Sequence, residues 1–425
     1  MTATQKCAKR YDFSIYLTSV MDHLDSALYG FLAPMLAPLF FPDHDPMTQL
    51  ILAYSVLGTS ILTRPIGSVI FGNLAHRRGP NKAIQWTLTG LVICAFMLSI
   101  LPTHNDVGPW APCILIALRM TKGIFAAGES AITKLLILEN KIGKNAFKAS
   151  YRYQYATMVG IIKASALSAL AFHYQDISPH LWRGAFFIGF LGSLMAFWLR
   201  THHQPKETLR STYPSFFTLA QLRQMMDIHK GPFVTIALIN ALSYVTYAFP
   251  FLLMNTLIPM ISSITLDEMM AMTTSLLIFD LLLIPTLGRF VQRFPYQQTM
   301  ILACLMLVLG TPALFYCMPD DSILYVAMIR IWIIFWGVVF MCPINLCTRD
   351  LLKGTEKFLI HGIAAALGTS TFGRLCPAIG LYIWHTTHIS WAPALYVSCI
   401  ALMALGVLAF KSFSAQTKAV SSYSS

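Results

Sequence analysis

The chain has 425 residues, of which 56% are hydrophobic and only 11% are charged, and its formal net charge is +12. Soluble domains carry about a quarter charged residues, so this composition excludes a water-soluble globular surface. A positive charge of this size in a soluble protein would raise the question of nucleic-acid binding. Here Lys and Arg lie in short loops between apolar segments, so no nucleic-acid partner is expected.

Apolar segments long enough to cross a hydrocarbon core of about 30 Å follow one another along the chain. They predict an all-α integral membrane protein with twelve transmembrane helices. The first of these segments contains Asp22 and Asp25 and lacks a small-residue cleavage pattern, so we interpret it as a retained helix and not a signal peptide. The predicted helices span residues 12–40, 48–72, 83–101, 111–138, 151–173, 182–199, 232–256, 268–288, 299–317, 322–347, 358–383 and 390–411.

Lys and Arg occur in every second loop. The loops around Asp43, Asp106 and Asp320 contain neither residue type, whereas both termini and the alternate loops are basic. By the positive-inside rule the basic loops are cytoplasmic. We therefore expect a multi-pass protein of a cytoplasmic-type (inner) membrane, with both termini in the cytoplasm.

The longest hydrophilic stretch falls between the sixth and seventh predicted helices. It divides the chain into an N-terminal six-helix bundle (1–200), a cytoplasmic linker (201–231) and a C-terminal six-helix bundle (232–425). The two halves repeat each other, which predicts a solute site at their interface near mid-membrane, reached by rocking of one half against the other. The matching positions are Gly72, Arg77 and Gly79 with Gly288, Arg293 and Pro295, and Arg119 with Arg330.

Several motifs resemble one branch of a transporter superfamily. They are DHLDSALYGFLAP in the first helix, RPIGSVIFGNLAHRRGPNKA in the second helix and the loop after it, RMTKGIFAAGES in the fourth, HLWRGAFFIG in the sixth and ALGTSTFGRLCPAIG in the eleventh. The chain is similar in these segments to the metabolite:proton symporters of the major facilitator superfamily, which carry proline and betaine, 2-oxoglutarate, citrate or shikimate. The resemblance implies the major facilitator fold, two six-helix pseudo-symmetric bundles, and symport of a solute with protons.

The resemblance also implies roles for particular residues. Tyr29 follows the acidic positions of the first motif and is expected to contact the solute. The loop after the second helix is expected to act in gating, although the family's loop Asp is His76 here, which weakens or rebuilds its charge interaction. In the fourth helix Lys122 replaces the family's Gln and adds a positive charge. The expected gating residues are Arg64, Gly72, His76, Arg77, Gly79 and Lys82.

Acidic residues inside the predicted helices are candidates for proton coupling, because a charge at the bilayer centre costs about 2.5–3.5 kcal/mol on insertion scales. Asp22 and Asp25 lie at mid-depth and about 60° apart on one helix face. We predict that one of them binds the coupled proton, with Glu129 and Asp280 as the next candidates. The alternative is that Asp22 or Asp25 forms a structural ion pair with Arg119, and that Glu129 is a fixed partner of Lys134 or of the loop arginines.

The basic residues inside the predicted helices indicate what the solute carries. Arg119 and Lys122 share a helix face and are expected to recognise the solute; Lys163, which is too deep to snorkel, Arg330 and Arg374 are further candidates. Basic residues exceed acidic ones, which favours an anionic or zwitterionic solute. The basic residues counted are Arg64, Arg119, Lys122, Lys134, Lys163, Arg183, Arg330 and Arg374, and the acidic ones are Asp22, Asp25, Glu129 and Asp280.

Two histidines inside predicted helices receive structural interpretations. His23, between the two acids of the first helix, is expected to pack among helices, and His361 near a helix end is expected to be solvated. The nine cysteines are scattered without metal-ligand spacing, so neither a disulfide framework nor a metal site is indicated.

No phosphate-binding loop, metal motif or nucleophile signature occurs in the sequence, so neither an enzyme nor a cofactor is expected. We predict a proton-coupled importer of a small carboxylate, betaine or amino-acid-like solute, which acts as a monomer in the lipid bilayer. An exporter of a metabolite, drug or polycarboxylate siderophore has the same sequence features and stays open as an alternative. A non-transporting membrane sensor on the same fold is the other alternative.

Overall fold

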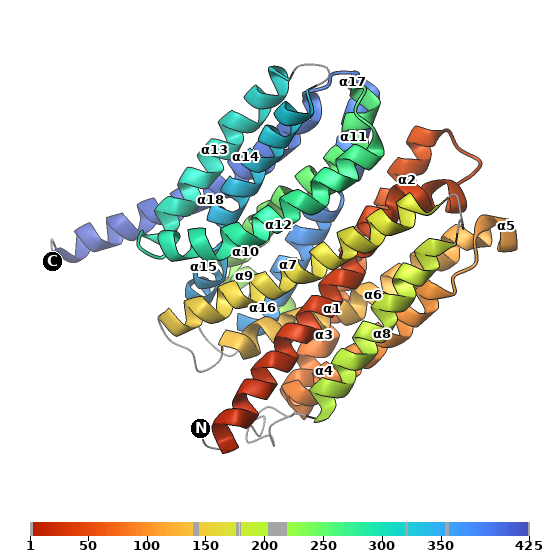
Figure 1. Ribbon diagram of the computed structural model, residues 1–425. Helices are drawn as coiled ribbons and strands as arrows, with labels where there is room; N and C mark the ends of the chain where they lie inside the picture. Colours follow the sequence, from red (N-terminus) through yellow and green to blue (C-terminus); the bar gives the residue numbers. More distant parts are fainter. Residues whose placement is uncertain are drawn as a thin grey trace.

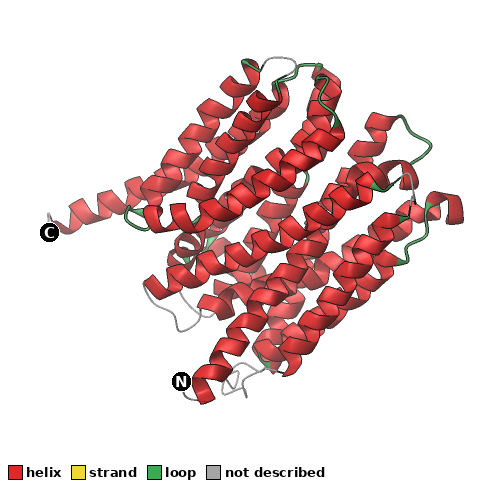
Figure 2. Ribbon diagram, viewed as in Figure 1, coloured by secondary structure: helices red, strands yellow, loops and turns green. Residues whose placement is uncertain are grey.

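The computed structural model describes residues 3–138, 144–175, 178, 180–202, 219–318, 322–352 and 357–423, and the regular structure in these ranges is helical (Figure 2). Ten helices in the described part are long and apolar enough to cross a membrane by length and composition. The predicted count of twelve is therefore not confirmed by this criterion. The two remaining predicted spans correspond to α1, which carries Asp22 and Asp25, and to the segment 357–387, which carries Arg374.

The first eight helices form the N-terminal part of the molecule. In this part α1 packs against α7 and α8, α3 packs against α6, and α4 packs against both α6 and α8. The helices are α1 (Ala3–Phe40), α2 (Pro46–Gly58), α3 (Ser60–Arg78), α4 (Pro80–Ser99), α5 (His104–Val107), α6 (Trp110–Leu138), α7 (Lys144–His173) and α8 (Leu181–His202).

The remaining helices include two π-helical turns, η1 and η2, each inserted between α-helices. Here α13 packs against α14 and α18, and α10 packs against α16, η2 and α18. The elements are α9 (Leu219–Ile228), α10 (Lys230–Ala248), η1 (Phe249–Leu253), α11 (Met254–Ile261), α12 (Leu266–Val291), α13 (Tyr296–Tyr316), α14 (Ile323–Met341), α15 (Ile344–Leu351), α16 (Lys357–Gly368), η2 (Thr369–Arg374), α17 (Cys376–Thr387) and α18 (Ala392–Tyr423). Residues 203–218 of the predicted linker lie outside the described residues.

Local sequence explains where several helices begin and end. Asp45 caps α2 by accepting a hydrogen bond from the Thr48 amide at 3.0 Å, and Pro46 occupies the first turn, where its missing N–H costs nothing. Gly79 separates α3 from α4 at φ 86°, a backbone conformation that L side chains rarely adopt. Pro80 then starts α4.

Three glycines allow neighbouring helices to touch backbone to backbone. A Cβ at Gly67 would lie 2.1 Å from the Ile124 carbonyl oxygen, and one at Gly160 would lie 2.2 Å from the Val20 carbonyl oxygen. At Gly368 the corresponding distance, to the Ala237 carbonyl oxygen, is 1.9 Å. These contacts join α3 to α6, α7 to α1 and α16 to α10, so no larger residue fits without moving a helix.

The N-terminal helices meet the C-terminal ones most extensively along the pairs α7 with α12, α3 with α16, and α2 with α17. Figure 1 shows the yellow α7 crossing the middle of the molecule beside α12, and both chain termini at the same end. Hydrogen bonds between side chains of the described residues also cross between these groups. Tyr54 and Thr256 hydroxyls lie 2.9 Å apart, and so do those of Ser165 and Thr274.

A polar cluster lies in the segment between α4 and α6 that contains α5. Asp106 accepts hydrogen bonds from the amide and hydroxyl of Thr103, and Arg183 donates to it at 3.4 Å. These hydrogen bonds from Thr103 lower the pKa of Asp106, and the nearby Arg183 charge lowers it further by a smaller amount. Arg183 also donates to the Leu101 carbonyl at 3.0 Å, so it anchors α8 to this loop. It is not among the residues that line the cavity described in the next section.

Candidate functional site

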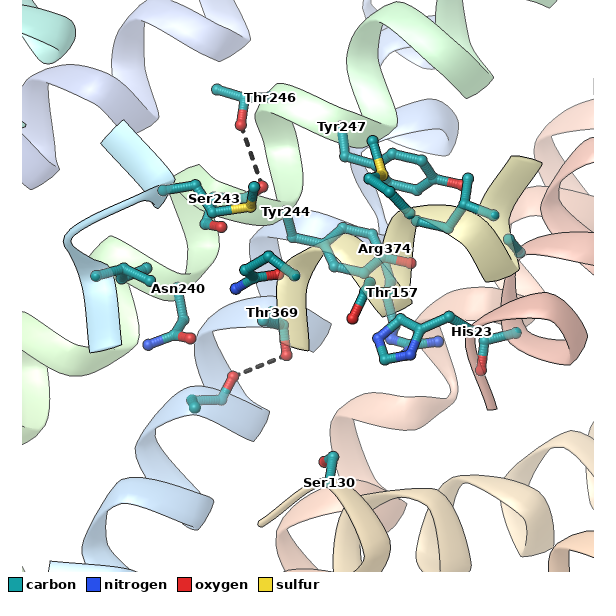
Figure 3. Close-up of a pocket in the computed structure, with 18 of the residues that line it drawn as sticks. His23, Ser130, Thr157, Asn240, Ser243, Tyr244, Thr246, Tyr247, Thr369 and Arg374 are labelled. Atoms are coloured by element: carbon teal, nitrogen blue, oxygen red, sulfur yellow. Dashed lines mark hydrogen bonds between the residues drawn. The ribbon is translucent and has the colours of Figure 1, made fainter. Parts of the chain in front are cut away.

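A cavity of about 200 Å³ lies between the N-terminal and C-terminal helices. Its wall is formed by side chains from α1, α3, α6 and α7 on one side and from α10, α12, α14, α15, α16 and η2 on the other. Figure 3 shows Tyr244, Tyr247 and Arg374 reaching into the space that Thr157 and His23 face from the N-terminal helices. We call this space the central cavity.

The charged side chains of the central cavity are balanced. Two acids and two arginines line it, together with two histidines. One acid, one arginine and one histidine come from the N-terminal helices, and the others come from the C-terminal helices. These residues are Asp22, Arg64, His23, Asp280, Arg374 and His361.

Asp22 is the acid of the N-terminal side that reaches the cavity wall. Its side chain is 8% exposed, and one carboxylate oxygen has no hydrogen-bond partner among the described residues. The Nδ1 atom of His23 lies 3.9 Å from the other oxygen and 2.8 Å from the Ser19 carbonyl oxygen. His23 therefore lines the cavity beside Asp22. From the sequence, only a packing role was expected for His23, and this position was not predicted.

Asp25 is one turn further along α1 and is differently placed. Its carboxylate forms an ion pair with the Lys122 ammonium of α6, and both side chains are 4% exposed. Lys122 also lines a small second cavity of about 20 Å³, which Arg119, Arg64 and Arg374 share. The two candidates for proton coupling on α1 thus differ: Asp22 faces the central cavity, whereas Asp25 is paired with a buried cation.

Arg119 lies directly over an aromatic ring. Its Cζ atom is 3.9 Å from the centroid of Tyr29, an arrangement that favours the guanidinium electrostatically. The Tyr29 hydroxyl is fully buried and donates to the Ala53 carbonyl at 2.9 Å. Tyr29 therefore holds Arg119 and α2 in place. It was expected to contact the solute, but it is absent from the lining of both cavities.

Two arginines line both cavities. Arg64 donates to Ser130 at 3.4 Å, and the Arg374 guanidinium lies 5.3 Å from the centroid of the Tyr244 ring. The Nε atom of each has no hydrogen-bond partner within the described chain. Arg374 is the last residue of the π-helical turn η2, where one extra residue per turn changes the face on which following side chains project.

Asp280 is the acid of the C-terminal side. It lies on α12, is 6% exposed and lines the central cavity. No ion pair or hydrogen bond of its side chain is found within the described residues, and one of its oxygens is fully enclosed without a donor. His361, expected to be solvated, is half-buried and lines the same cavity.

Three other predicted site residues lie elsewhere. Lys163 is exposed on α7 and does not line either cavity, which corrects its expected place beside the solute. Arg330 is fully buried and donates to Asn255, to Thr273 at 2.8 Å and to the Pro250 carbonyl at 2.7 Å, so it binds α14 to η1, α11 and α12.

Glu129 is fully buried on α6 and accepts a hydrogen bond from the Thr133 hydroxyl at 2.9 Å, away from the lining of both cavities. Its position is therefore inside the N-terminal helices, not at their interface with the C-terminal ones. Among the described residues, no group of three or more His, Cys, Asp or Glu side chains could hold a metal ion.

The predicted gating residues are spread from the cavity to the surface. Arg64 lines the central cavity, while Arg77 and Lys82 are exposed beside the turn at Gly79. A Cβ on Gly72 would lie 3.4 Å from Leu359 of α16, so this glycine marks the contact between α3 and α16. His76 belongs to α3, but its side chain is outside the described part of the chain.

A family model described as the Major Facilitator Superfamily matches residues 15–380 of this chain. The chain belongs to this superfamily. Members of the superfamily with solved structures share its fold: a D-xylose-proton symporter has a TM-score of 0.72 at 13% identity and covers 94% of this chain and 97% of its own. A human organic anion transporter, MFSD10, has a TM-score of 0.70 at 14% identity, over 94% of this chain and 99% of its own.

Curated relatives are proton symporters and other solute carriers. The proline/betaine transporter of Escherichia coli strain K12 is 24% identical over 92% of this chain and 80% of its own. The citrate-proton symporter of Klebsiella pneumoniae is 24% identical over 91% and 87%, and the alpha-ketoglutarate permease of Escherichia coli strain K12 is 22% identical over 91% and 89%. This major facilitator protein is accordingly a multi-pass membrane transporter and not an enzyme, and the resemblance inferred from its motifs is confirmed.

Proposed function

We propose that this protein is a proton-coupled secondary transporter that imports a small organic anion or zwitterion by alternating access. The observation that carries the proposal is the central cavity, because its wall combines acids and arginines from both groups of helices. A solute bound there contacts both sides of the α7–α12 and α3–α16 interfaces at once. Rocking of the two sides about the solute exposes it to one membrane face and then to the other.

The proton is proposed to bind at Asp22. This carboxylate lies at the wall of the cavity that the solute is proposed to enter, and one of its oxygens is enclosed without a hydrogen-bond partner among the described residues. Its charge acts on Arg64 and Arg374, which line the same space, and on His23. Protonation of Asp22 removes a negative charge that competes with a solute carboxylate for the arginines, so proton and anionic group bind together.

Asp25 and Lys122 are proposed to act as a pair that keeps α1 against α6. Breaking such a pair leaves an uncompensated buried charge, which costs about 3–5 kcal/mol in soluble proteins. We therefore assign the pair a positioning role and keep Asp25 as the second candidate for coupling. Glu129, which is buried away from the cavity, is the third.

The halves 1–200 and 232–425 are proposed to be the two moving bodies, joined by the linker 201–231. The positive-inside pattern supports cytoplasmic termini in an inner membrane. The contacts between Gly72 and Leu359 on one side of the cavity, and between Tyr54 and Thr256 on the other, are proposed to open alternately. A single chain supplies every element of this cycle, so the functional unit is proposed to be the monomer.

Uptake into proteoliposomes tests the proposed function. Purified protein would be reconstituted and presented with radiolabelled succinate, 2-oxoglutarate, citrate, proline and glycine betaine, with and without an imposed pH gradient, acidic outside. Accumulation of at least one compound that requires the gradient is expected. Gradient-dependent efflux of a solute loaded into the lumen, with no gradient-dependent uptake, would establish an exporter. No transport of any compound in either direction would favour a sensor.

A further inference from the structure

The charged residues that line the central cavity limit the possible charge of the solute more closely than does the count of all charged residues predicted within the membrane. Eight basic residues are predicted within the membrane, and the side chain of Lys134 lies outside the described part of the chain. Among the other seven, only Arg64 and Arg374 line the central cavity. Arg119 and Lys122 line only the small second cavity, where Lys122 is already paired with Asp25. Arg183 is bound to Asp106, Arg330 is enclosed among neutral acceptors, and Lys163 is exposed. The basic excess that favours an anion is therefore not in the cavity.

Asp280 is an acid of the cavity wall that has no counter-charge beside it within the described residues. It is buried in the cavity wall and has no cationic partner among the described residues. Buried charges in proteins are normally paired, because removal from water without compensation is costly. A solute that carries only negative charge would leave Asp280 unpaired and would be repelled by it.

Aromatic rings lie in the same cavity wall. Tyr244 and Tyr247, on successive turns of α10, have ring centroids 5.8 Å apart at an interplanar angle of 84°, and both line the central cavity (Figure 3). Ring faces attract ammonium groups, and clusters of rings bind quaternary ammonium ions in proteins. Arg374 already lies over Tyr244, so Tyr247 is the ring left for a ligand cation.

We propose that the solute of this transporter is a zwitterion without net charge, whose carboxylate binds Arg64 and Arg374 and whose ammonium group binds Asp280 and the ring of Tyr247. The inference rests on the proposed function, because it takes the central cavity as the transport site. It gives Asp280 a role in solute recognition in place of proton coupling. Proton coupling then stays on the N-terminal side of the cavity, at Asp22.

Binding to the purified transporter tests the charge requirement directly. Isothermal titration calorimetry would compare glycine betaine, N,N-dimethylglycine and proline with succinate, 2-oxoglutarate and citrate. A matched probe is 3,3-dimethylbutyrate, which keeps the shape and carboxylate of glycine betaine but has carbon in place of the charged nitrogen. At least one zwitterion is expected to bind, and glycine betaine is expected to bind about tenfold or more tightly than its uncharged-head analogue.

Substitutions at Asp280 assign the effect to this residue. Asp280→Asn is expected to weaken zwitterion binding about tenfold or more and to remove the preference over 3,3-dimethylbutyrate. Asp280→Glu keeps the charge and is expected to retain that preference. Asp267→Asn, on the exposed outer turn of the same helix, is the matched control and should bind like the wild type. Equal thermal unfolding midpoints would establish that the variants are folded.

Each other outcome overturns the inference in a distinguishable way. Binding and pH-driven uptake of a di- or tricarboxylate, with no zwitterion bound, would refute the inference and leave the proposed function intact. Unchanged zwitterion binding in Asp280→Asn, combined with loss of pH-driven accumulation, would make Asp280 the coupling acid. Binding of none of the zwitterions would also refute it, and the proteoliposome panel would then decide the proposed function separately.

Discussion

The Lys122 ammonium on α6 is ion-paired with the Asp25 carboxylate on α1, and the two side chains are 4% exposed. Asp25→Asn is expected to destabilise the protein by about 3–5 kcal/mol, because it leaves the Lys122 charge buried and unpaired. The double variant Asp25→Asn, Lys122→Met removes both charges and should recover most of this loss. Thermal unfolding in detergent measures both. An Asp25→Asn protein as stable as the wild type would show that the pair is not structural.

Arg374 and Arg330 provide a second comparison, because both are arginines of the C-terminal part and only Arg374 lines the central cavity. Arg374→Gln is expected to weaken solute binding by about tenfold or more, since it removes a charged donor, while changing stability little. Arg330→Gln is expected to lower stability by about 1–3 kcal/mol, because Thr273, Asn255 and the Pro250 carbonyl lose their donor. Calorimetry measures solute binding and thermal unfolding measures stability, so together they separate the two effects. Weakened binding in an Arg330→Gln protein of normal stability would show that Arg330 belongs to the solute site.

Glycines within and between the two groups of helices should respond differently to substitution. Gly160→Val is expected to prevent folding, because its Cβ would overlap the Val20 carbonyl oxygen at 2.2 Å. Gly72→Val meets only the flexible end of Leu359 at 3.4 Å, so the protein should fold but turn over slowly as α3 and α16 separate and rejoin. Gly184→Ala, which meets nothing within 4 Å, is the control. Normal turnover in Gly72→Val would exclude a gating role for the α3–α16 contact.

The membrane orientation inferred from the basic loops can be tested by cysteine labelling. In a background without the nine native cysteines, Asp43→Cys should react with a membrane-impermeant maleimide added to intact cells. Arg223→Cys, on α9 at the end of the linker, should react only after the membrane is opened. Labelling of residue 223 from outside would reverse the orientation or change the number of crossings.

The sequence predicts the fold of this protein better than it predicts the faces of its helices. Repeated apolar segments and the motif resemblance are enough for the superfamily, because both depend on patterns along the chain. Depth in the membrane also follows from residue number, yet depth does not give direction. Lys163, which was expected at mid-depth, is exposed on α7 and lines neither cavity.

The internal repeat likewise predicts position better than role. Arg119 and Arg330 match in the two halves, but Arg119 is held by the ring of Tyr29 and Arg330 by neutral acceptors on three neighbouring elements. The direction of Arg374 depends on the π-helical turn η2, which no propensity in the sequence indicates. His23 was expected to pack among helices and His361 to be solvated, but both line the central cavity. The sequence does not indicate this, because access to a cavity depends on the packing of helices that are distant in sequence.

Proton coupling at Asp22 is the central claim, and one pair of transport measurements tests it most directly. Wild-type and Asp22→Asn proteins would be reconstituted and assayed with a compound that the wild type accumulates, first for uptake driven by a pH gradient and then for exchange of labelled against unlabelled solute. The Asn variant keeps the shape of the side chain but has no proton site, so exchange should continue while gradient-driven accumulation disappears. Accumulation by Asp22→Asn with the wild-type dependence on pH would contradict the account.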